Sequence, residues 1–158
     1  WLAEKYDIGY DMFSTIMGAR EVQAKNMAQF LVNKAEENNM PVVIHGKAYK
    51  PDVEYCIGSY STLVGHYVAE AGKPVVYLDP LADNPDDVVA EVPEASVVLM
   101  AHNRKVTYGY VTEFSNDDLS DGFYAEIPAG SIIVDPWREM DQNNDNYEVI
   151  YYGNTRPE

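Results

Sequence analysis

Residues 42–52 read VVIHGKAYKPD, a short apolar run that breaks at Gly46 into a loop with an aromatic residue, two lysines and a proline. A second apolar run follows at residues 75–80. The segment between the two runs has apolar residues at helical spacing and closes at Gly72. This order predicts a buried strand, a loop, a helix and a second buried strand. Ligands of open α/β sheets bind at loops that leave the carboxyl ends of strands, so the loop after residue 45 is a candidate site.

Five segments have the composition of strands. We expect them at about residues 42–46, 74–79, 96–101, 131–135 and 148–152. The third is an almost continuous apolar run, which is typical of a parallel strand covered on both faces. The pattern predicts an α/β fold, a Rossmann-like three-layer domain with a mainly parallel sheet, which occupies residues 41–158.

The segment before this domain has a helical pattern. Apolar residues recur between about residues 12 and 38, and charged residues separate them. This spacing predicts a long amphipathic helix that ends at Asn38 and Asn39, just before Pro41. A family resemblance of residues 19–23 implies that residues 1–40 are a helical linker from the end of a central dimerisation region of a longer enzyme. Its apolar stripe, through Ile16 and Met27, predicts a homodimer contact with a second copy.

Composition and charge exclude several classes of function. The chain has 158 residues, of which 46% are hydrophobic, and this is enough to bury the core of one domain. A net charge of −15 repels a phosphate backbone, so we expect no nucleic acid partner. No run of about 18 apolar residues is present, so we expect no membrane span and a cytoplasmic location.

The few cations follow predicted strands. Lys47 and Lys50 follow the first strand, Arg104 and Lys105 follow the third, and Arg138 follows the fourth. Because the carboxyl ends of parallel strands meet at one edge of a sheet, these side chains could form a positive pocket on an acidic body. The alternative is that they are scattered surface charges.

The loop resembles a known family signature. Residues 46–51 read GKAYKP, with Ser59 and Ser61 following, and this is similar to the G-x-A-F-K-P…S-x-A signature of UDP-glucose/GDP-mannose dehydrogenases. That signature opens their C-terminal nucleotide-sugar-binding domain. A looser similarity runs from about residue 12 to about residue 138. The flank departs from the pattern, because Ile57 stands where the family has an arginine, and Gln23 replaces an asparagine common in the preceding helix.

The resemblance implies that different parts of a larger enzyme bind NAD, carry the catalytic cysteine and bind the nucleotide sugar. The whole enzyme would oxidise the C6 hydroxyl of a nucleotide sugar, with a UDP-sugar as the expected substrate, to a carboxylate, with two NAD in succession and a cysteine-bound intermediate. NAD would bind to an N-terminal domain, and neither that site nor the family's G-x-G-x-G-G-S-C-F-P-K cysteine motif occurs in this chain. We therefore expect no catalytic residue and no cofactor here, and an inactive chain on its own. Its partners would be the nucleotide sugar and the remainder of the enzyme.

The resemblance also implies substrate-binding residues. Tyr49 and Lys50 match the aromatic residue and the lysine of the signature, and a loop lysine can meet a diphosphate or a sugar hydroxyl. Lys47 is a further candidate. Many relatives carry D-x-R after the fourth strand, where Arg138 is separated from Asp135 by two residues rather than one. Arg138 is thus either a ligand of the nucleotide sugar or a surface arginine.

Other chemistry-bearing residues have plainer interpretations. Cys56, the single cysteine, has no nearby histidine in sequence and is read as a structural or surface thiol. His45 lies inside a strand and is read as a core residue, and the histidine spacings form no metal motif. Asp79 ends the second strand, where a dinucleotide-binding fold places an acidic residue on a ribose.

Two other functions remain open. The altered flank, with Tyr55 and Ile57, favours a stand-alone interaction or regulatory domain that kept the fold and lost its ligand. A small NAD-dependent oxidoreductase is disfavoured, because the loop after Gly46 lacks the second and third glycines of a dinucleotide fingerprint.

Overall fold

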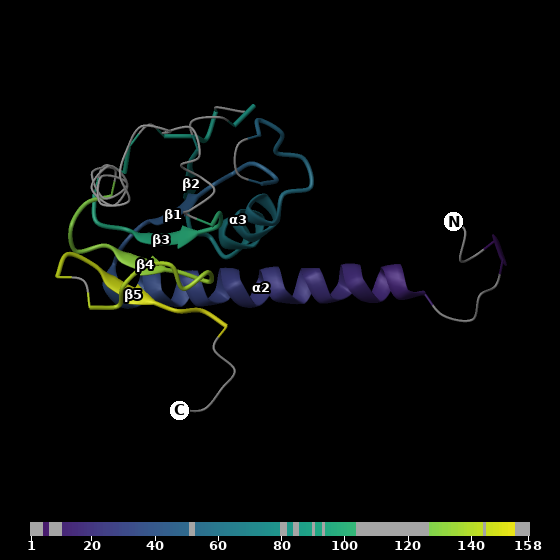
Figure 1. Ribbon diagram of the computed structural model, residues 1–158, viewed down its shortest axis with the longest axis horizontal. Helices are drawn as coiled ribbons and strands as arrows, with labels where there is room; N and C mark the ends of the chain where they lie inside the picture. Colours follow the sequence, from purple (N-terminus) through teal and green to yellow (C-terminus); the bar gives the residue numbers. More distant parts are fainter. Residues whose placement is uncertain are drawn as a thin grey trace.

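A computed structural model describes residues 5–6, 11–50, 53–79, 82–83, 86–89, 91–92, 94–103, 127–143 and 145–153 of the chain (Figure 1). Five strands in this part of the chain form one sheet in the order β2-β1-β3-β4-β5, and every neighbouring pair is parallel. Their bounds are β1 Val42–His45, β2 Val75–Leu78, β3 Val97–Met100, β4 Ile132–Val134 and β5 Glu148–Ile150. The predicted α/β fold, Rossmann-like with a parallel sheet, is confirmed.

The pairing of β1 explains why a candidate site forms at one edge. Val42 lies opposite Val75 of β2 on one side and opposite Val97 of β3 on the other. The chain order of the strands therefore reverses between β1 and β3. Loops that leave the two strands at such a reversal diverge, and ligands of open α/β sheets bind in the crevice between them.

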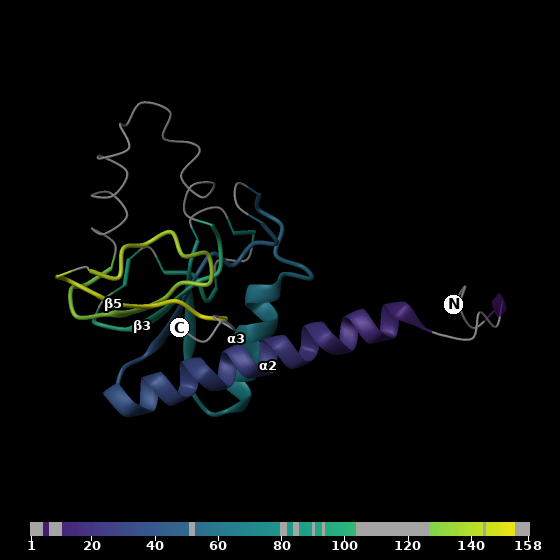
Figure 2. The same cartoon turned by 60° about the horizontal axis from the view of Figure 1, so that its bottom comes forward.

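Two helices in the described residues cover the same face of the sheet. Helix α2 (Met12–Asn38) begins at Asp11, whose side chain accepts a hydrogen bond from Ser14 N, and ends at Asn39 in a left-handed conformation. Helix α3 (Tyr60–Glu70) begins after Ser59, which caps it. Figure 2 shows α3 lying against the middle of α2. The predicted long helix is confirmed, and its N-terminal end runs beyond the α/β body (Figure 1).

Alternate residues of each strand enter two hydrophobic layers. Val42 and Ile44 of β1 point to the helices, where they pack among buried residues of α2 and α3. Val43 points to the opposite face, into a cluster completed by loop side chains that include Met140 and Tyr147. A strand buried on both faces needs apolar residues at every position, which is why β1 and β3 read as continuous apolar runs.

The elements differ from the sequence prediction at their ends. The strands are shorter than expected by one or two residues at an end, and β5 ends at Ile150 rather than 152 because Tyr152 lies in a turn. Helix α3 starts earlier than the apolar spacing suggested, because the Ser59 cap sets its beginning. Among the described residues, no helix combines the length and apolar character needed to span a membrane.

Candidate ligand site at the carboxyl edge of the sheet

The loop after β1 starts with a glycine that nothing larger can replace. Gly46 has a φ of +99°, and a Cβ built on it would lie 2.5 Å from the ring of His102. Its N–H donates to Leu78 O at 3.0 Å, which extends the pairing with β2 by one residue. His102, which follows β3, therefore packs over the start of this loop and fills the point where the strand order reverses.

Asp79 fixes the next two residues of the loop. This buried carboxylate follows β2, and its Oδ2 accepts hydrogen bonds from Lys47 N at 2.8 Å and from Ala48 N at 2.9 Å. In a dinucleotide site the backbone N–H groups of this first loop would face a pyrophosphate. Here the N–H groups of Lys47 and Ala48 face the Asp79 carboxylate, so they do not fit the pyrophosphate of NAD. Asp79 instead stabilises the conformation of the loop.

Two serines of the signature hold the loop from the other side. Ser59 Oγ donates to Ala48 O at 3.1 Å, and Ser61 Oγ donates to Lys47 O at 3.0 Å. His102 Nε2 also lies 3.0 Å from Ala48 O, and since a carbonyl only accepts, the ring carries its proton on Nε2. The helix cap and the loop are thus one buried hydrogen-bonded unit.

The structure separates the two lysines of the loop. Lys47 is 3% exposed, forms an ion pair with Asp87 and lies 5.3 Å from the centre of the Tyr77 ring. Tyr49 is 62% exposed, and Lys50 next to it is exposed as well. The loop therefore directs Lys47 into the protein and presents Tyr49 and Lys50 at the surface.

The loop after β4 is equally ordered. Asp135 is 1% exposed, and its two oxygens accept hydrogen bonds at 2.8–3.0 Å from the backbone N–H groups of Trp137, Arg138, Glu139 and Met140. Arg138 has a φ of +58°, an uncommon conformation for a residue with a side chain. The sharp turn presents Trp137 and Arg138, both exposed, at the same edge of the sheet as Lys50.

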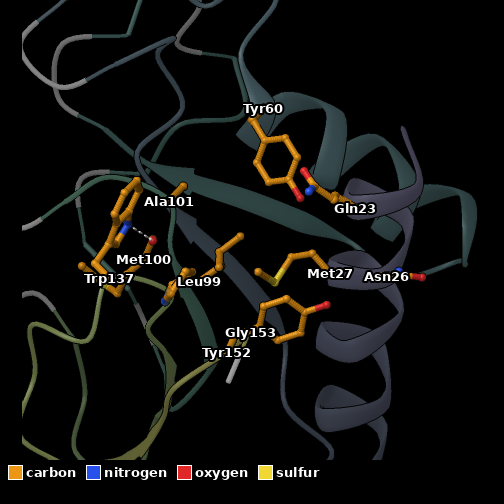
Figure 3. Close-up of a pocket in the computed structure, with 11 residues that line it drawn as sticks. Gln23, Asn26, Met27, Tyr60, Leu99, Met100, Ala101, Trp137, Tyr152 and Gly153 are labelled. Carbon is orange, nitrogen blue, oxygen red and sulfur yellow. Dashed lines mark hydrogen bonds between the residues drawn. The ribbon is translucent and has the colours of Figure 1, made fainter. Parts of the chain in front are cut away.

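A cavity of about 540 Å³ lies between α2 and the ends of β3, β4 and β5 (Figure 3). Trp137 stands across it from Met27 of α2, and the indole N–H donates to Met100 O at 2.9 Å. The described residues that line it are all uncharged, and most are apolar or aromatic: Gln23, Asn26, Met27, Tyr60, Leu99, Met100, Ala101, Pro136, Trp137, Tyr152 and Gly153.

The aromatic walls of the cavity are held by neighbours. The Tyr152 ring packs against Phe30 with their centres 5.2 Å apart. Tyr60, the first residue of α3, is half-buried, and burial raises the pKa of its hydroxyl, so the phenol stays neutral at physiological pH. Arg20 of α2 donates to Gly58 O at 2.6 Å and joins the helix to the segment just before Tyr60.

The predicted site residues have different environments. Tyr49, Lys50 and Arg138 are exposed at the carboxyl edge, whereas the candidate Lys47 is buried in its ion pair. Pro51, Arg104 and Lys105 lie outside the described residues. The described residues that line the cavity are neutral, and neither Lys50 nor Arg138 is among them.

The sequence analysis missed the aromatic residues of the cavity. A signal was present, because Trp137 lies three residues after the end of a buried strand and Tyr60 follows a helix-capping serine. Cys56 is a buried thiol whose Sγ donates to Glu54 O, and burial raises its pKa, which agrees with a structural thiol. Within the described ranges, no three His, Cys, Asp or Glu side chains gather closely enough to hold a metal ion.

Comparisons with known proteins define the fold. A scan against models of protein families finds no match, and a search of curated proteins also finds none. Among solved structures, the chain is similar to a UDP-N-acetyl-mannosamine dehydrogenase from S. aureus, with a TM-score of 0.56 and 18% sequence identity. The match covers 85% of this chain and 30% of the dehydrogenase, so the chain spans less than a third of that protein's length. At this identity the likeness shows a shared fold.

Proposed function

We propose that this chain is the C-terminal nucleotide-sugar-binding domain of an NAD-dependent nucleotide-sugar 6-dehydrogenase, with a UDP-sugar as its ligand. The observation that carries the proposal is the loop after β1. Its backbone is fixed by Asp79, Ser59 and Ser61, and its tip presents Tyr49 and Lys50 at the carboxyl edge of a parallel sheet. Ligands of this fold class bind at that edge. The likeness to a part of a nucleotide-sugar dehydrogenase supports the same function.

The two exposed cations suit the diphosphate of such a ligand. Lys50 extends from the loop after β1 and Arg138 from the loop after β4, and both loops end strands at one edge. An ammonium group acts as a point charge on a phosphate, and a guanidinium group can bind two phosphate oxygens at once. Lys47 would act indirectly, since its ion pair with Asp87 anchors the base of the loop.

The role of the domain is to position the sugar. Binding energy from the nucleotide, which does not react, would hold the C6 hydroxyl where the chemistry takes place. NAD supplies hydride acceptance when bound, and in this proposal NAD and the cysteine nucleophile belong to the remainder of the enzyme. The described residues of this chain would bind the nucleotide and orient the sugar.

A pair of lysine substitutions tests the proposal. We expect Lys50→Ala to weaken UDP binding by roughly tenfold to a hundredfold, because it removes a charge-assisted contact of about 1.5–3 kcal/mol. Lys73→Ala is the matched control. It changes the net charge equally but lies at the other edge of the sheet, before β2, where Lys73 pairs with Glu36 at 3.7 Å. Calorimetric titration of the three proteins with UDP measures the effect.

Equal UDP affinity for the wild type and Lys50→Ala would contradict the proposal. A loss of equal size in Lys73→Ala would also contradict it, because the effect would then reflect net charge and not a contact at the loop. Circular dichroism should show that both variants keep the fold, since neither lysine lies in the core.

A second function is favoured by the flank of the loop. Tyr55 and Ile57 are 54% and 73% exposed, and two large apolar side chains so close together on a surface suit contact with another protein. In that case the chain would be an interaction or regulatory domain that kept the fold and lost the ligand. Absence of measurable UDP binding by the wild-type chain would favour this function over the first.

A further inference from the structure

The cavity beside α2 is chemically unlike the loop that carries Lys50. It is neutral and aromatic, whereas Lys50 and Arg138 offer positive charge. We propose that this cavity binds the base ring of the nucleotide by stacking against the indole of Trp137. The identification of the ligand as a nucleotide rests on the proposed function, whereas the preference for a planar neutral ring rests on the cavity itself.

Trp137 is prepared for stacking before any ligand arrives. Its backbone is fixed by Asp135, which accepts four consecutive N–H groups, and its indole N–H is held by Met100 O (Figure 3). The side chain is nevertheless 48% exposed. With its only donor already used, the indole can offer a ligand its π face. An exposed aromatic ring held in one orientation loses little entropy when a base stacks on it.

The other walls suit a flat ring as well. Tyr152 is braced by Phe30, and Met27 contributes a polarizable thioether opposite the indole. Figure 3 shows Tyr60 at one end of the cavity, next to Gln23. Thioethers and aromatic side chains interact favourably with π systems, so an aromatic ligand is favoured over an aliphatic one of the same size.

One amide side chain can recognise the edge of a base. Gln23 and Asn26 of α2 both line the cavity, and Figure 3 shows the Gln23 amide directed toward Tyr60, whereas the Asn26 amide lies on the other side of the helix. The Gln23 amide has both donors and an acceptor, and the edge of a base presents the same two kinds of group. A phosphate would find no cation among the described side chains that line the cavity, so we place the ring there and not the diphosphate.

The cavity and the Lys50 loop are joined through one carbonyl group. Ala48 O accepts from Ser59, the residue before Tyr60, and lies 3.0 Å from His102, the residue after Ala101. Tyr60 and Ala101 both line the cavity, and Lys50 is two residues beyond Ala48. A nucleotide at this edge could therefore place its base in the cavity and its phosphates toward Lys50.

Tryptophan fluorescence gives a direct test, because the chain has two tryptophans. In a Trp1→Phe background, emission comes from Trp137 alone. We expect uridine, which has a base and no phosphate, to quench this emission saturably. By calorimetry, Trp137→Ala should weaken the binding of both uridine and UDP roughly tenfold, the scale of one base–aromatic stack. Trp137→Phe should recover part of the loss, and Phe13→Ala, which removes an exposed aromatic ring near the N-terminal end of α2, should change neither affinity.

The two proposals fail in different ways. If Lys50→Ala weakens UDP binding while Trp137→Ala does not and uridine causes no quenching, the base-binding cavity is wrong and the proposed function stands. If uridine quenches Trp137 but UDP binds no more tightly and Lys50→Ala has no effect, the cavity is confirmed and the proposed function is wrong. Quenching by guanosine and not by uridine would support a base-binding cavity, and it would identify the base as guanine and not uracil.

Discussion

Buried carboxylates organise the candidate site residue by residue. Asp79 and Asp135 each follow a strand and are almost fully buried. Each carboxylate accepts hydrogen bonds from backbone N–H groups of a loop. A buried carboxylate is stable only when such donors surround it. The two loops are therefore rigid for the same reason, and the exposed side chains Lys50 and Trp137 stand on rigid supports.

His45 couples the stability of this edge to pH. It is 3% exposed, and burial, followed by the nearby His102, lowers its pKa to about 4, although Asp79 acts in the opposite direction. The unfolded chain binds a proton at His45 near pH 6.5, and the folded chain does not. Stability is therefore complete above pH 6.5 and falls as the pH drops toward 4, by about 3 kcal/mol for this shift.

Urea unfolding of the wild type and His45→Leu at pH 7.5 and 4.5 measures this contribution. We expect the wild type to lose more stability than the variant between the two pH values, since leucine has no proton to bind. Other acidic groups titrate in both proteins and cancel in the difference. An equal loss in the two proteins would show that the unfavourable protonation of His45 is absent.

At the scale of elements, Gly65 of α3 is explained by the packing of this helix against the sheet. A glycine inside a helix costs about 1 kcal/mol relative to alanine. At Gly65, however, a Cβ would lie 2.0 Å from the hydroxyl oxygen of Tyr77 and 3.4 Å from Cδ1 of Ile44. Tyr77 is 4% exposed, so its ring is enclosed by neighbours and has little room to move aside. The glycine allows α3 to lie close to β1 and β2.

Alanine substitutions in the two helices should therefore have opposite effects. We expect Gly65→Ala to destabilise the fold by about 1–3 kcal/mol through overpacking. Gly18→Ala is the matched control on α2, where a Cβ meets nothing within 4 Å, and it should stabilise the fold by up to about 1 kcal/mol. Thermal unfolding of both variants measures the difference, and a stabilising effect of Gly65→Ala would contradict the packing described for α3.

At the scale of the whole molecule, the N-terminal end of α2 runs beyond the α/β body (Figure 1) and leaves an apolar surface open. Near this end of the helix, Met12, Phe13, Ile16 and Met17 are each about half exposed or more. The four residues form a stripe at helical spacing. We propose that a second copy of the chain covers this stripe, because two copies offer each other the same apolar face.

Sedimentation velocity tests this assembly. We expect the average mass to rise with concentration toward twice the 17.8 kDa of one chain. Replacing both Phe13 and Ile16 by serine should keep the chain monomeric, and Phe13→Leu, which preserves the apolar surface, should not. A wild-type chain that stays monomeric at high concentration would contradict the proposal and favour the remainder of a longer enzyme as the partner of this stripe.

Patterns that are local in the chain were sufficient to predict the elements. Apolar runs predicted the strands to within one or two residues, and the spacing of apolar residues predicted α2. Both depend on the geometry of a single strand or helix, which repeats over a few residues. The break of the apolar run at Gly46 predicted the loop after β1 in the same local way, because glycine readily adopts the φ of +99° found there.

Contacts between distant residues decided the chemistry of the site. Lys47 and Lys50 look alike in sequence, and only the position of Asp87, 40 residues after Lys47, shows that the first lysine is buried in an ion pair. The cavity combines residues of α2 with residues that follow β3, β4 and β5. No short-range pattern contains such a set, because it depends on the order in which the strands pair. Packing in three dimensions thus brought neutral and aromatic residues of distant segments together in one cavity, which the positions of the cations in the sequence did not predict.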